Sequence, residues 1–374
     1  TFDPRLISVI PAAVAEAAIK SGAARKNIDD LELYKDQLSN RLDPSMSIMQ
    51  GINAKVRKNP KRVIFAEGED ENMLKAAIEF GRNKLGVPIL IGAENRVKEQ
   101  LKKIGLDENY KIEIVNSTDK EKRDKYVKHL YKKLQREGQL ERDVDRLVRN
   151  DRIAWGSSMI ACKDADAMVT GNIRHYAASI EKLKKVVDAR PGEEIFGMTM
   201  IVSKGKTILV ADTNVTELPS SERLIKISKS CVRIARLFGF EPKVAFLSHS
   251  TFGKPLSRNT RHVRDAIEKL KKEKVDFDFD GEMQPDVALN PIYQEIYPFS
   301  KIVGNANVLI MPALHSAAIS TKLMKVFGGG KNIGPLLIGL GQPIEVAPLR
   351  ASTSEILNLA SIAAYSSDVI DYSV

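Results

Sequence analysis

Short apolar runs alternate with amphipathic helical segments from Lys61 onward, and this alternation constrains the fold more than any other feature of the sequence. The segments between the runs place apolar residues at helical spacing, as Val97, Leu101 and Ile104 do. The runs themselves are Val63–Ala66, Pro88–Ile91, Ile112–Val115 and Ala167–Thr170. Because a helix between two strands returns the chain to the same end of the sheet, the pattern predicts parallel strands in an α/β fold.

The rhythm changes within residues 191–335. Met198–Val202 and Thr207–Ala211 flank a short Gly-containing turn, which is the pattern of an antiparallel hairpin. A different strand rhythm inside one chain indicates a second α/β unit inserted into the first. We predict three parts: a helical tail and linker at 1–45, a first domain at 46–190 plus 336–374, and a second, inserted domain at 191–335.

Helical patterns also occur outside these units. Residues before Pro44 and before Pro60 are disfavoured in helices, so both prolines mark helix boundaries. The predicted helices are Ile7–Gly22, Leu31–Arg41, Met46–Lys58 and a long charged stretch over about Asp119–Arg152.

Charge, cysteine and histidine content exclude several classes of function. Lys and Arg number 58 against 48 Asp and Glu, but the two signs interleave on helical faces and aromatics are only 6%, so we expect no nucleic-acid partner. Cys162 and Cys231 lack paired spacing, which favours a reducing cytoplasmic location and no disulfide. No apolar run reaches the roughly 18 residues of a membrane span and no secretory signal is visible, so we expect no membrane partner. The five histidines have no ligand spacing, and we predict no metal site.

The common nucleotide and hydrolase motifs are absent, and polar, Gly-rich loops are the main functional signal. Most of these loops directly follow a predicted strand, where free amides of loops and helix N-termini can face an anion. The loops are Val169–Asn172, Leu247–Gly253, Asp280–Gln284, Pro312–Ser316 and Phe327–Pro335. We therefore predict a cleft that binds an anionic small molecule.

The order of these loops resembles the phosphotransacetylase (phosphate acetyltransferase) family over about residues 46–374. The matching segments are Phe65–Asp70, Asp166–Gly171, Leu247–Gly253, Asp280–Asp286, Gly304–Pro312, Phe327–Pro335 and Asn358–Ala364. The resemblance implies two Rossmann-like α/β domains with the active cleft between them, assembled as a dimer through the inserted domain. Upstream, Phe2–Ala24 is similar to the closing helix of bacterial malic enzymes, and the combination is the layout of the hybrid malic enzymes. The start at Thr1 instead of Met leads us to expect a longer polypeptide.

The chain departs from the family at the positions where the resemblance implies catalysis. Active members use arginines to hold phosphate and CoA, a serine to stabilise the oxyanion and an acid to deprotonate the thiol. Gap-free matching places Pro348 at the serine and Leu349 at the arginine, with Arg350 one position late and Glu355 at the acid. Other arginine positions hold Asn72, Glu181 and Val326. We therefore predict no catalytic residues and little acetyl transfer.

The loops that remain are expected to bind acetyl-CoA as an effector. We expect its phosphates to be engaged by Lys322, Lys325, Lys331 and Arg350. The loop residues are expected to present backbone N–H donors to the cleft. The predicted ligand-binding residues are Thr170, Gly171, Asn172, Asn305, Asn307, Lys322, Gly328, Gly329, Gly330, Lys331, Asn332, Gly334, Pro335 and Arg350, and Lys325 is a further phosphate contact. No cofactor is predicted in this chain, because NADP and a divalent metal belong to the malic-enzyme half that the resemblance implies upstream.

Three hypotheses remain open at this point. The first is a regulatory acetyl-CoA-binding module that is joined to a malic-enzyme domain of the same polypeptide and forms a homodimer or larger homo-oligomer. The second is an active phosphate acetyltransferase in which Arg350 and Glu355 take over the vacated roles. The third is a structural oligomerisation domain whose cleft no longer binds anything.

Overall fold

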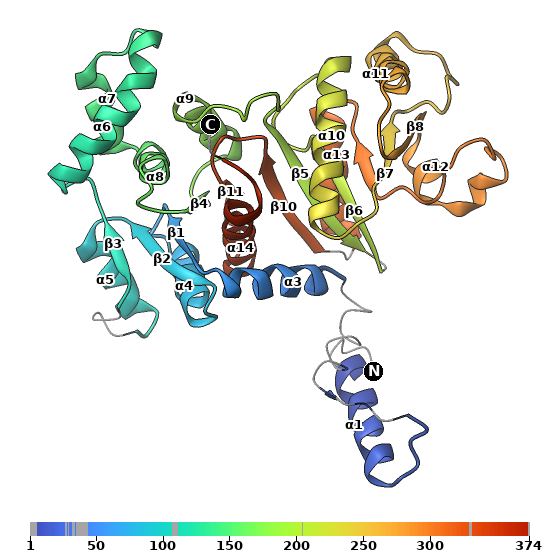
Figure 1. The fold of residues 1–374 in the computed structure, drawn as a ribbon, viewed down its shortest axis with the longest axis horizontal. Helices are drawn as coiled ribbons and strands as arrows, with labels where there is room; N and C mark the ends of the chain where they lie inside the picture. The colour runs from blue at the N-terminus through green and yellow to red at the C-terminus, as the bar shows by residue number, and fades with distance from the viewer. Residues whose placement is uncertain are drawn as a thin grey trace.

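The computed structural model describes residues 6–26, 28, 30, 31, 34, 44–106, 111–203, 205–328 and 331–372. Two β-sheets lie side by side, each covered by helices on both faces (Figure 1). A long helix near the C-terminus, α14, lies between the two sheets in this view, and α3 runs beneath it. The mixed α/β architecture that the sequence predicts is therefore confirmed.

The first sheet has five strands, all of them parallel. In spatial order the strands are β11 (Ile344–Ala347), β4 (Ala167–Gly171), β1 (Lys61–Phe65), β2 (Gly86–Ile91) and β3 (Glu113–Val115). The helices that join or cover them are α4 (Glu71–Arg82), α5 (Glu94–Lys103), α6 (Lys120–Leu134), α7 (Glu141–Asn150), α8 (Arg152–Ala161), α9 (Tyr176–Val186) and α14 (Thr353–Val369). The four predicted strands of this unit are present, and β11 is a strand that the sequence pattern did not reveal.

The second sheet has six strands and mixed directions. In spatial order the strands are β10 (Lys331–Ile338), β5 (Phe196–Ser203), β6 (Lys206–Ala211), β9 (Val308–Ile310), β7 (Lys243–Leu247) and β8 (Asp278–Met283). The predicted hairpin is confirmed, because β5 pairs antiparallel with β6, and β10 pairs antiparallel with β5. The associated helices are α10 (Ser221–Leu237), α11 (Arg261–Lys272), α12 (Pro285–Leu289) and α13 (Leu314–Phe327), with short 3₁₀ turns at Gln135–Glu137, Arg258–Thr260 and Pro291–Gln294.

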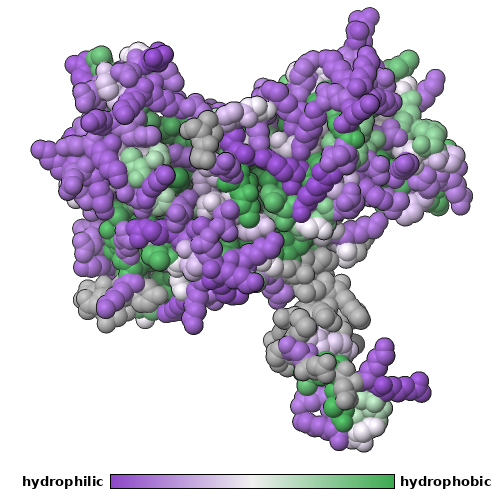
Figure 2. All heavy atoms as spheres, viewed as in Figure 1, coloured by the Kyte–Doolittle hydropathy of each residue, from purple (hydrophilic) through white to green (hydrophobic). Residues whose placement is uncertain are grey.

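Alternate residues of each strand enter different cores. Along β1, Val63 and Phe65 pack under α4 and α14, whereas Ile64 faces the α6–α9 side. The core beneath α4 and α14 continues without a break into the second sheet, where it includes residues of β5, β7 and α10. Figure 2 agrees with this arrangement, because hydrophilic residues cover most of the visible outer surface and hydrophobic ones gather in the middle of the view.

The structure adds detail to two segments that the sequence predicts. The charged stretch at Asp119–Arg152 contains two helices, α6 and α7, because Gly138 adopts φ 81° after the 3₁₀ turn that follows α6, and Asp151 at its end caps the start of α8. The expected division at residues 335 and 336 falls inside β10, whose residues pair with β5 from Lys331 to Ile338. The Gly-rich loop is therefore shorter than the sequence suggested.

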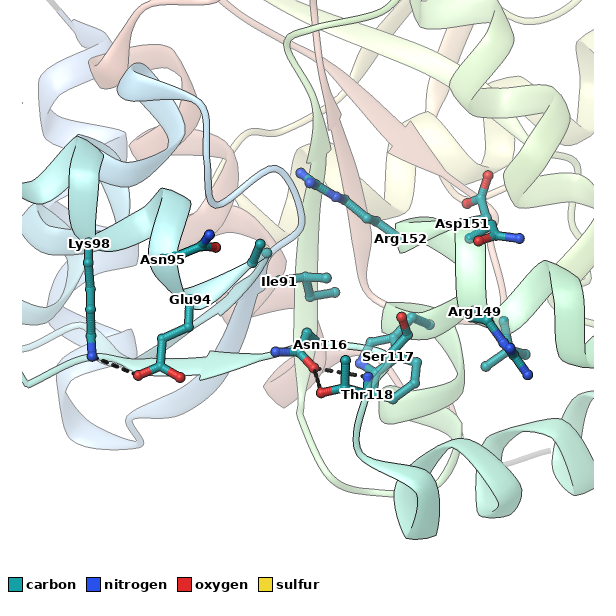
Figure 3. A pocket seen from close by; sticks show the side chains of 15 residues that line it. Ile91, Glu94, Asn95, Lys98, Asn116, Ser117, Thr118, Arg149, Asp151 and Arg152 are labelled. Carbon is teal, nitrogen blue, oxygen red and sulfur yellow. Dashed lines mark hydrogen bonds and ion pairs between the residues drawn. The ribbon is translucent and has the colours of Figure 1, made fainter.

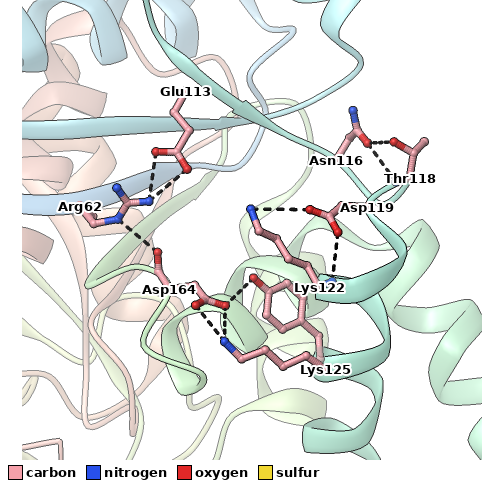
Figure 4. A network of polar contacts seen from close by, with 9 residues as sticks. Arg62, Glu113, Asn116, Thr118, Asp119, Lys122, Lys125 and Asp164 are labelled. Carbon is pink, nitrogen blue, oxygen red and sulfur yellow. Dashed lines mark hydrogen bonds and ion pairs between the residues drawn. The ribbon is translucent and has the colours of Figure 1, made fainter.

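A network of polar side chains lies at the amino-terminal ends of the strands of the first sheet (Figure 4). Arg62 at the start of β1 donates two 3.0 Å hydrogen bonds to the Glu113 carboxylate on β3. Asp164, in the turn before β4, accepts hydrogen bonds from Lys125 and Tyr126 of α6 at 2.8 Å. The bonds to Asp164 hold α6 against the amino-terminal ends of the strands, opposite their carboxyl ends.

The N-terminal helices are α1 (Leu6–Lys20) and α3 (Pro44–Lys58). They agree with the predicted helices Ile7–Gly22 and Met46–Lys58, whereas most of Leu31–Arg41 lies outside the described residues. Within the described parts of the chain, no helix is both long and apolar enough to cross a bilayer. The same residues contain no cluster of His, Cys, Asp and Glu suited to a metal ion, and Cys162 and Cys231 are free thiols.

Candidate functional site

The first sheet reverses its strand order between β1 and β4, and polar loops meet at this point. The chain passes from β1 outward to β2 and β3 and then returns to place β4 on the other side of β1. Open α/β sheets bind ligands at such a switch point, beyond the carboxyl ends of the strands. We call the two loops here, Glu67–Asp70 and Thr170–Asn172, the switch-point loops.

The switch-point loops are bonded to each other. The buried Glu67 carboxylate accepts hydrogen bonds from the Thr170 hydroxyl and the Gly171 N–H, both at 3.0 Å. Asn172, at φ 65°, donates from its amide to Asp70 at 2.6 Å. The predicted ligand residues Thr170 and Gly171 therefore already donate to protein groups, and the donors on which the sequence argument relied are not free.

Burial raises the pKa of Glu67 to about 7, although Thr170, Arg174, Arg152 and Gly171 oppose the shift. Arg152 itself pairs with Glu69 at 2.9 Å and so does not pair with Glu67. Desolvation wins because the carboxyl group is fully enclosed and receives only neutral hydrogen bonds. Glu67 is thus a proton-holding structural group at the centre of the loops.

The β11–α14 turn adds a third segment to this region. Arg350, at φ 59°, donates its backbone N–H to the Asn172 carbonyl at 2.9 Å and leaves its side chain exposed. Asn72 of α4 donates to the Ala351 carbonyl at 3.1 Å, so this residue ties α4 to the turn. Pro348 and the half-exposed Leu349 complete the turn without contributing a hydroxyl or a guanidinium group.

An open pocket lies beside this turn, between α3, α13, β10 and the start of α14. Its volume is about 520 Å³, within the range of small-molecule sites. It is lined by Met49, Gln50, Asn53, Lys325, Lys331, Asn332, Ile333, Ser352, Ser354, Glu355 and Asn358. We call it the seam pocket. It brings together four residues that the sequence argument singled out, Lys325, Lys331, Asn332 and Glu355.

Two asparagines that line this pocket each have one amide oxygen without a hydrogen-bond partner. The Oδ1 atoms of Asn53 and Asn332 are buried and have no hydrogen-bond partner. An unsatisfied buried acceptor costs roughly 1–3 kcal/mol, which a ligand donor can recover. Two amide oxygens of the seam pocket therefore remain unpaired, whereas the polar groups of the switch-point loops pair with one another.

Glu355, at the predicted position of the acid, is engaged at the start of α14. Its carboxylate accepts from the Ser352 N–H at 2.9 Å in a capping box and pairs with Lys325 at 2.9 Å. Burial raises the pKa of Glu355, but the hydrogen bonds from Ser352 and Lys325 outweigh burial and lower it below the usual value. A carboxylate held in this way is a weak proton acceptor for a thiol.

The remaining predicted residues are dispersed. Asn307 uses its side chain to hold Lys243 and Glu241 at 2.7 Å each, at the amino-terminal edge of the second sheet, and Asn305 is exposed in the same loop. Lys322 and Val326 are exposed on α13, and Glu181 is exposed on α9.

The Gly-rich loop between α13 and β10 is only partly described. Gly328 caps α13, and Gly334 at φ 114° precedes Pro335 inside β10, whereas Gly329 and Gly330 lie outside the described residues.

A second hollow, of about 770 Å³, lies at the carboxyl ends of β2 and β3 (Figure 3). Its wall includes Lys98, Arg149 and Arg152, which pair with Glu94, Asp145 and Glu69 respectively. Nothing in the sequence pattern indicated this hollow, because its walls come from three segments without Gly-rich loops. None of its lining residues belongs to the ligand-binding set that the sequence predicts, whereas Lys325, Lys331 and Asn332 line the seam pocket, so the seam pocket is the better candidate.

Comparisons with known proteins agree with this geometry. Residues 47–364 match the phosphate acetyl/butaryl transferase family model. The NADP-dependent malic enzyme of Rhizobium meliloti is 46% identical over 97% of this chain, which spans 48% of that protein. The phosphate acetyltransferase of Clostridium acetobutylicum is 30% identical over 85% of this chain and 97% of its own length. A crystal structure of a phosphotransacetylase from Streptococcus pyogenes superposes with a TM-score of 0.80, at 27% identity over 86% of this chain and 98% of that one.

The resemblance seen in the loops is thus matched by family, relatives and fold. The chain spans about half the length of the malic enzymes it matches, whereas it covers nearly all of the shorter Clostridium acetyltransferase. With the loops, the two sheets and the seam pocket in their observed places, the chain belongs to the phosphate acetyl/butaryl transferase family.

Proposed function

We propose that this chain is a regulatory acetyl-CoA-binding domain of an NADP-dependent malic enzyme and that it does not transfer acetyl groups. The observation that carries the proposal is the seam pocket, which is lined by two lysines and by two asparagines with unpaired amide oxygens, while Glu355 is held in a capping box. Malic-enzyme relatives of about twice this length support a fused catalytic partner. Oxidative decarboxylation of malate, NADP and a divalent metal then belong to that partner.

The chemistry of the pocket suits acetyl-CoA. Lys325 and Lys331 line it and supply positive charge for phosphates, and Asn53 and Asn332 supply amides for the two secondary amides of the pantetheine arm. Such a ligand needs no oxyanion donor, so Pro348 and Leu349 do not impair binding. Losing one oxyanion donor raises the barrier to acyl transfer by roughly 3 kcal/mol, and here serine and arginine are both replaced.

Isothermal titration calorimetry of the chain with acetyl-CoA tests the proposal, together with an assay of CoA-dependent acetyl phosphate consumption. We expect saturable binding and turnover at least roughly a hundredfold below that of an active phosphate acetyltransferase measured in parallel. Absence of binding at millimolar acetyl-CoA would refute the regulatory role. Vigorous turnover would instead favour an active transferase.

The active transferase is the second candidate, and one observation favours it. The Arg350 side chain is exposed in the turn next to Asn172, beside the switch-point loops. Its guanidinium group is therefore available to a phosphate. If this reading holds, Arg350→Ala abolishes acetyl phosphate consumption. If the regulatory role holds, the same variant leaves the low background turnover unchanged.

Assembly as a homodimer or larger homo-oligomer is also part of the proposal. The outer face of α13 exposes Ile319, Leu323, Val326 and Phe327 at helical spacing, with Phe327 83% exposed. A contiguous apolar helix face of this kind is typical of an interface. We expect Leu323→Glu to reduce the molar mass measured by light scattering, with Lys322→Glu on the same helix as a control.

A further inference from the structure

Glu355 is the only acid among the described residues that line the seam pocket. The pocket is also lined by Lys325 and Lys331, the two lysines that the proposed function assigns to phosphates. Burial raises the pKa of Glu355, but hydrogen bonds from Ser352 and Lys325 lower it below the usual value, so the carboxyl group is ionised at neutral pH. A negative charge opposes an anionic ligand, so Glu355 affects the affinity of this pocket.

The two carboxylate oxygens of Glu355 have different partners. Oε2 accepts from the N–H and from the hydroxyl of Ser352, both at 2.9 Å, and so completes the capping box at the start of α14. Oε1 accepts from the Lys325 ammonium group of α13 at 2.9 Å. The cap uses only one oxygen, so the ion pair with Lys325 is a separate feature of this residue.

The ion pair is open to exchange with a ligand. Glu355 is the only partner of Lys325 among the described residues, and solvent reaches both side chains, which are 56% exposed for Lys325 and 30% exposed for Glu355. An ion pair that water screens in this way is weak. A phosphate that approaches Lys325 therefore meets an ammonium group whose charge a carboxylate already neutralises, and the two anions compete for it.

We infer that Glu355 competes with the phosphates of the ligand for Lys325 and thereby limits the affinity of the seam pocket for an anion. This inference rests on the proposed function and names a residue that sets the strength of binding. In the empty pocket, the Glu355 carboxylate holds Lys325. In the occupied pocket, a phosphate oxygen takes its place, and Glu355 keeps only its bonds to Ser352.

Calorimetric titration of acetyl-CoA into the wild type and into Glu355→Gln tests the inference. Glutamine also completes a capping box, so the variant keeps an oxygen for Ser352 but offers Lys325 no negative charge. We expect its affinity to rise about fivefold, the upper end of what an exposed ion pair contributes. Glu268→Gln is the matched control, because Glu268 pairs with Lys271 at 3.0 Å on α11, outside the seam pocket, and we expect wild-type affinity.

The same substitution in a Lys325→Ala background separates competition from direct repulsion. Without Lys325 there is no ammonium group to release, so we expect Glu355→Gln to change the affinity of Lys325→Ala by less than about twofold. An equal rise in both backgrounds would mean that Glu355 repels the ligand directly, and it overturns the competition.

A crystal structure of the wild type with acetyl-CoA supplies a measurement that needs no variant. We expect the Lys325 Nζ atom to contact a phosphate oxygen and to lie beyond about 4 Å, the limit of an ion pair, from the Glu355 carboxylate. Unchanged affinity of Glu355→Gln, or a complex in which Lys325 still pairs with Glu355, overturns this inference and leaves the proposed function intact. Binding by Glu355→Gln alone supports the inference and overturns the proposed function, and failure of both proteins to bind overturns both.

Discussion

The switch-point loops and the seam pocket are built from similar residues but use them differently. In the switch-point loops, Glu67 accepts from Thr170 and Gly171, and Asp70 accepts from Asn172, so the polar groups satisfy one another. In the seam pocket, Asn53 and Asn332 keep buried oxygens without partners beside two lysines. The contrast teaches that Gly- and Asn-rich loops at strand ends can be closed structural joints. We propose that a ligand binds where polar groups remain unpaired.

The largest expected effect is on the closed region. Glu67→Ala removes the acceptor of two buried donors, Thr170 and Gly171, and we expect the free energy of unfolding to fall by roughly 2–5 kcal/mol. Chemical denaturation at pH 7 measures it. The control Glu71→Ala removes an exposed carboxylate paired with Lys75 and should change stability far less, because solvent screens an exposed ion pair. Equal effects of the two variants would mean that the loops are not a structural joint.

A buried acid on β11 predicts the pH dependence of stability. Glu345 on β11 accepts only from the Leu337 N–H among the described residues, and burial raises its pKa to about 8 from the usual 4.5. Between these values the folded chain keeps a proton that the unfolded chain releases, so stability falls as pH rises through this window, by at most roughly 1.4 kcal/mol per pH unit.

Glu345→Gln removes this titration. We expect the variant to lose less stability than the wild type between pH 4.5 and pH 8, as measured by denaturant unfolding at each pH. Glu67, with a pKa of about 7, contributes a smaller fall with the same sign in both proteins. Parallel curves for variant and wild type would show that the Glu345 carboxyl is not held neutral by burial.

Variants of two lysines of α13 distinguish a ligand in the seam pocket from a ligand on the surface around it. Sequence reasoning assigns both Lys322 and Lys325 to phosphates, but only Lys325 lines the pocket. We expect Lys325→Ala to weaken acetyl-CoA binding about tenfold, roughly 1.4 kcal/mol, and Lys322→Ala to leave it unchanged, as measured by calorimetry. An equal loss in both variants would place the ligand outside the seam pocket.

No effect on acetyl-CoA affinity is expected from the two asparagines before β9. Asn307→Ala removes hydrogen bonds to Lys243 and Glu241, which should cost roughly 1–2 kcal/mol of stability, whereas exposed Asn305 should be replaceable within roughly 0.5 kcal/mol. Neither variant should alter acetyl-CoA affinity, because both residues lie at the amino-terminal edge of the second sheet. A loss of affinity in either variant would extend the binding region far beyond the seam pocket.

Much of the fold could be predicted from the sequence because its signals are local. The strand at Val63–Ala66 and the hairpin around Gly205 follow from apolar runs and turn residues, and the structure contains both. β8 and β11 escaped notice because Asp278–Met283 contains Asp, Gly and Glu, and Ile344–Ala347 is very short. Their assignment depends on pairing partners, which a single strand does not reveal.

The candidate site was only partly predictable. Lys331, Asn332 and Glu355 were singled out from loops and family resemblance, and the structure places all three in the seam pocket. Asn53 was missed, because an asparagine on an amphipathic helix carries no binding signature. Asn307 looked like a ligand residue because its loop is polar, but its side chain holds two backbone groups.

The sequence by itself determined the alternation of strands and helices, the family, and the absence of serine and arginine at Pro348 and Leu349, since these depend on residue identity and order. Only the tertiary structure decided which polar groups remain available. Glu67 and Thr170 are 103 residues apart in the chain but form a hydrogen bond, and Asn53 and Asn332 line the same pocket. Hydrogen-bond satisfaction is a property of groups brought together in space, and a linear pattern does not contain it.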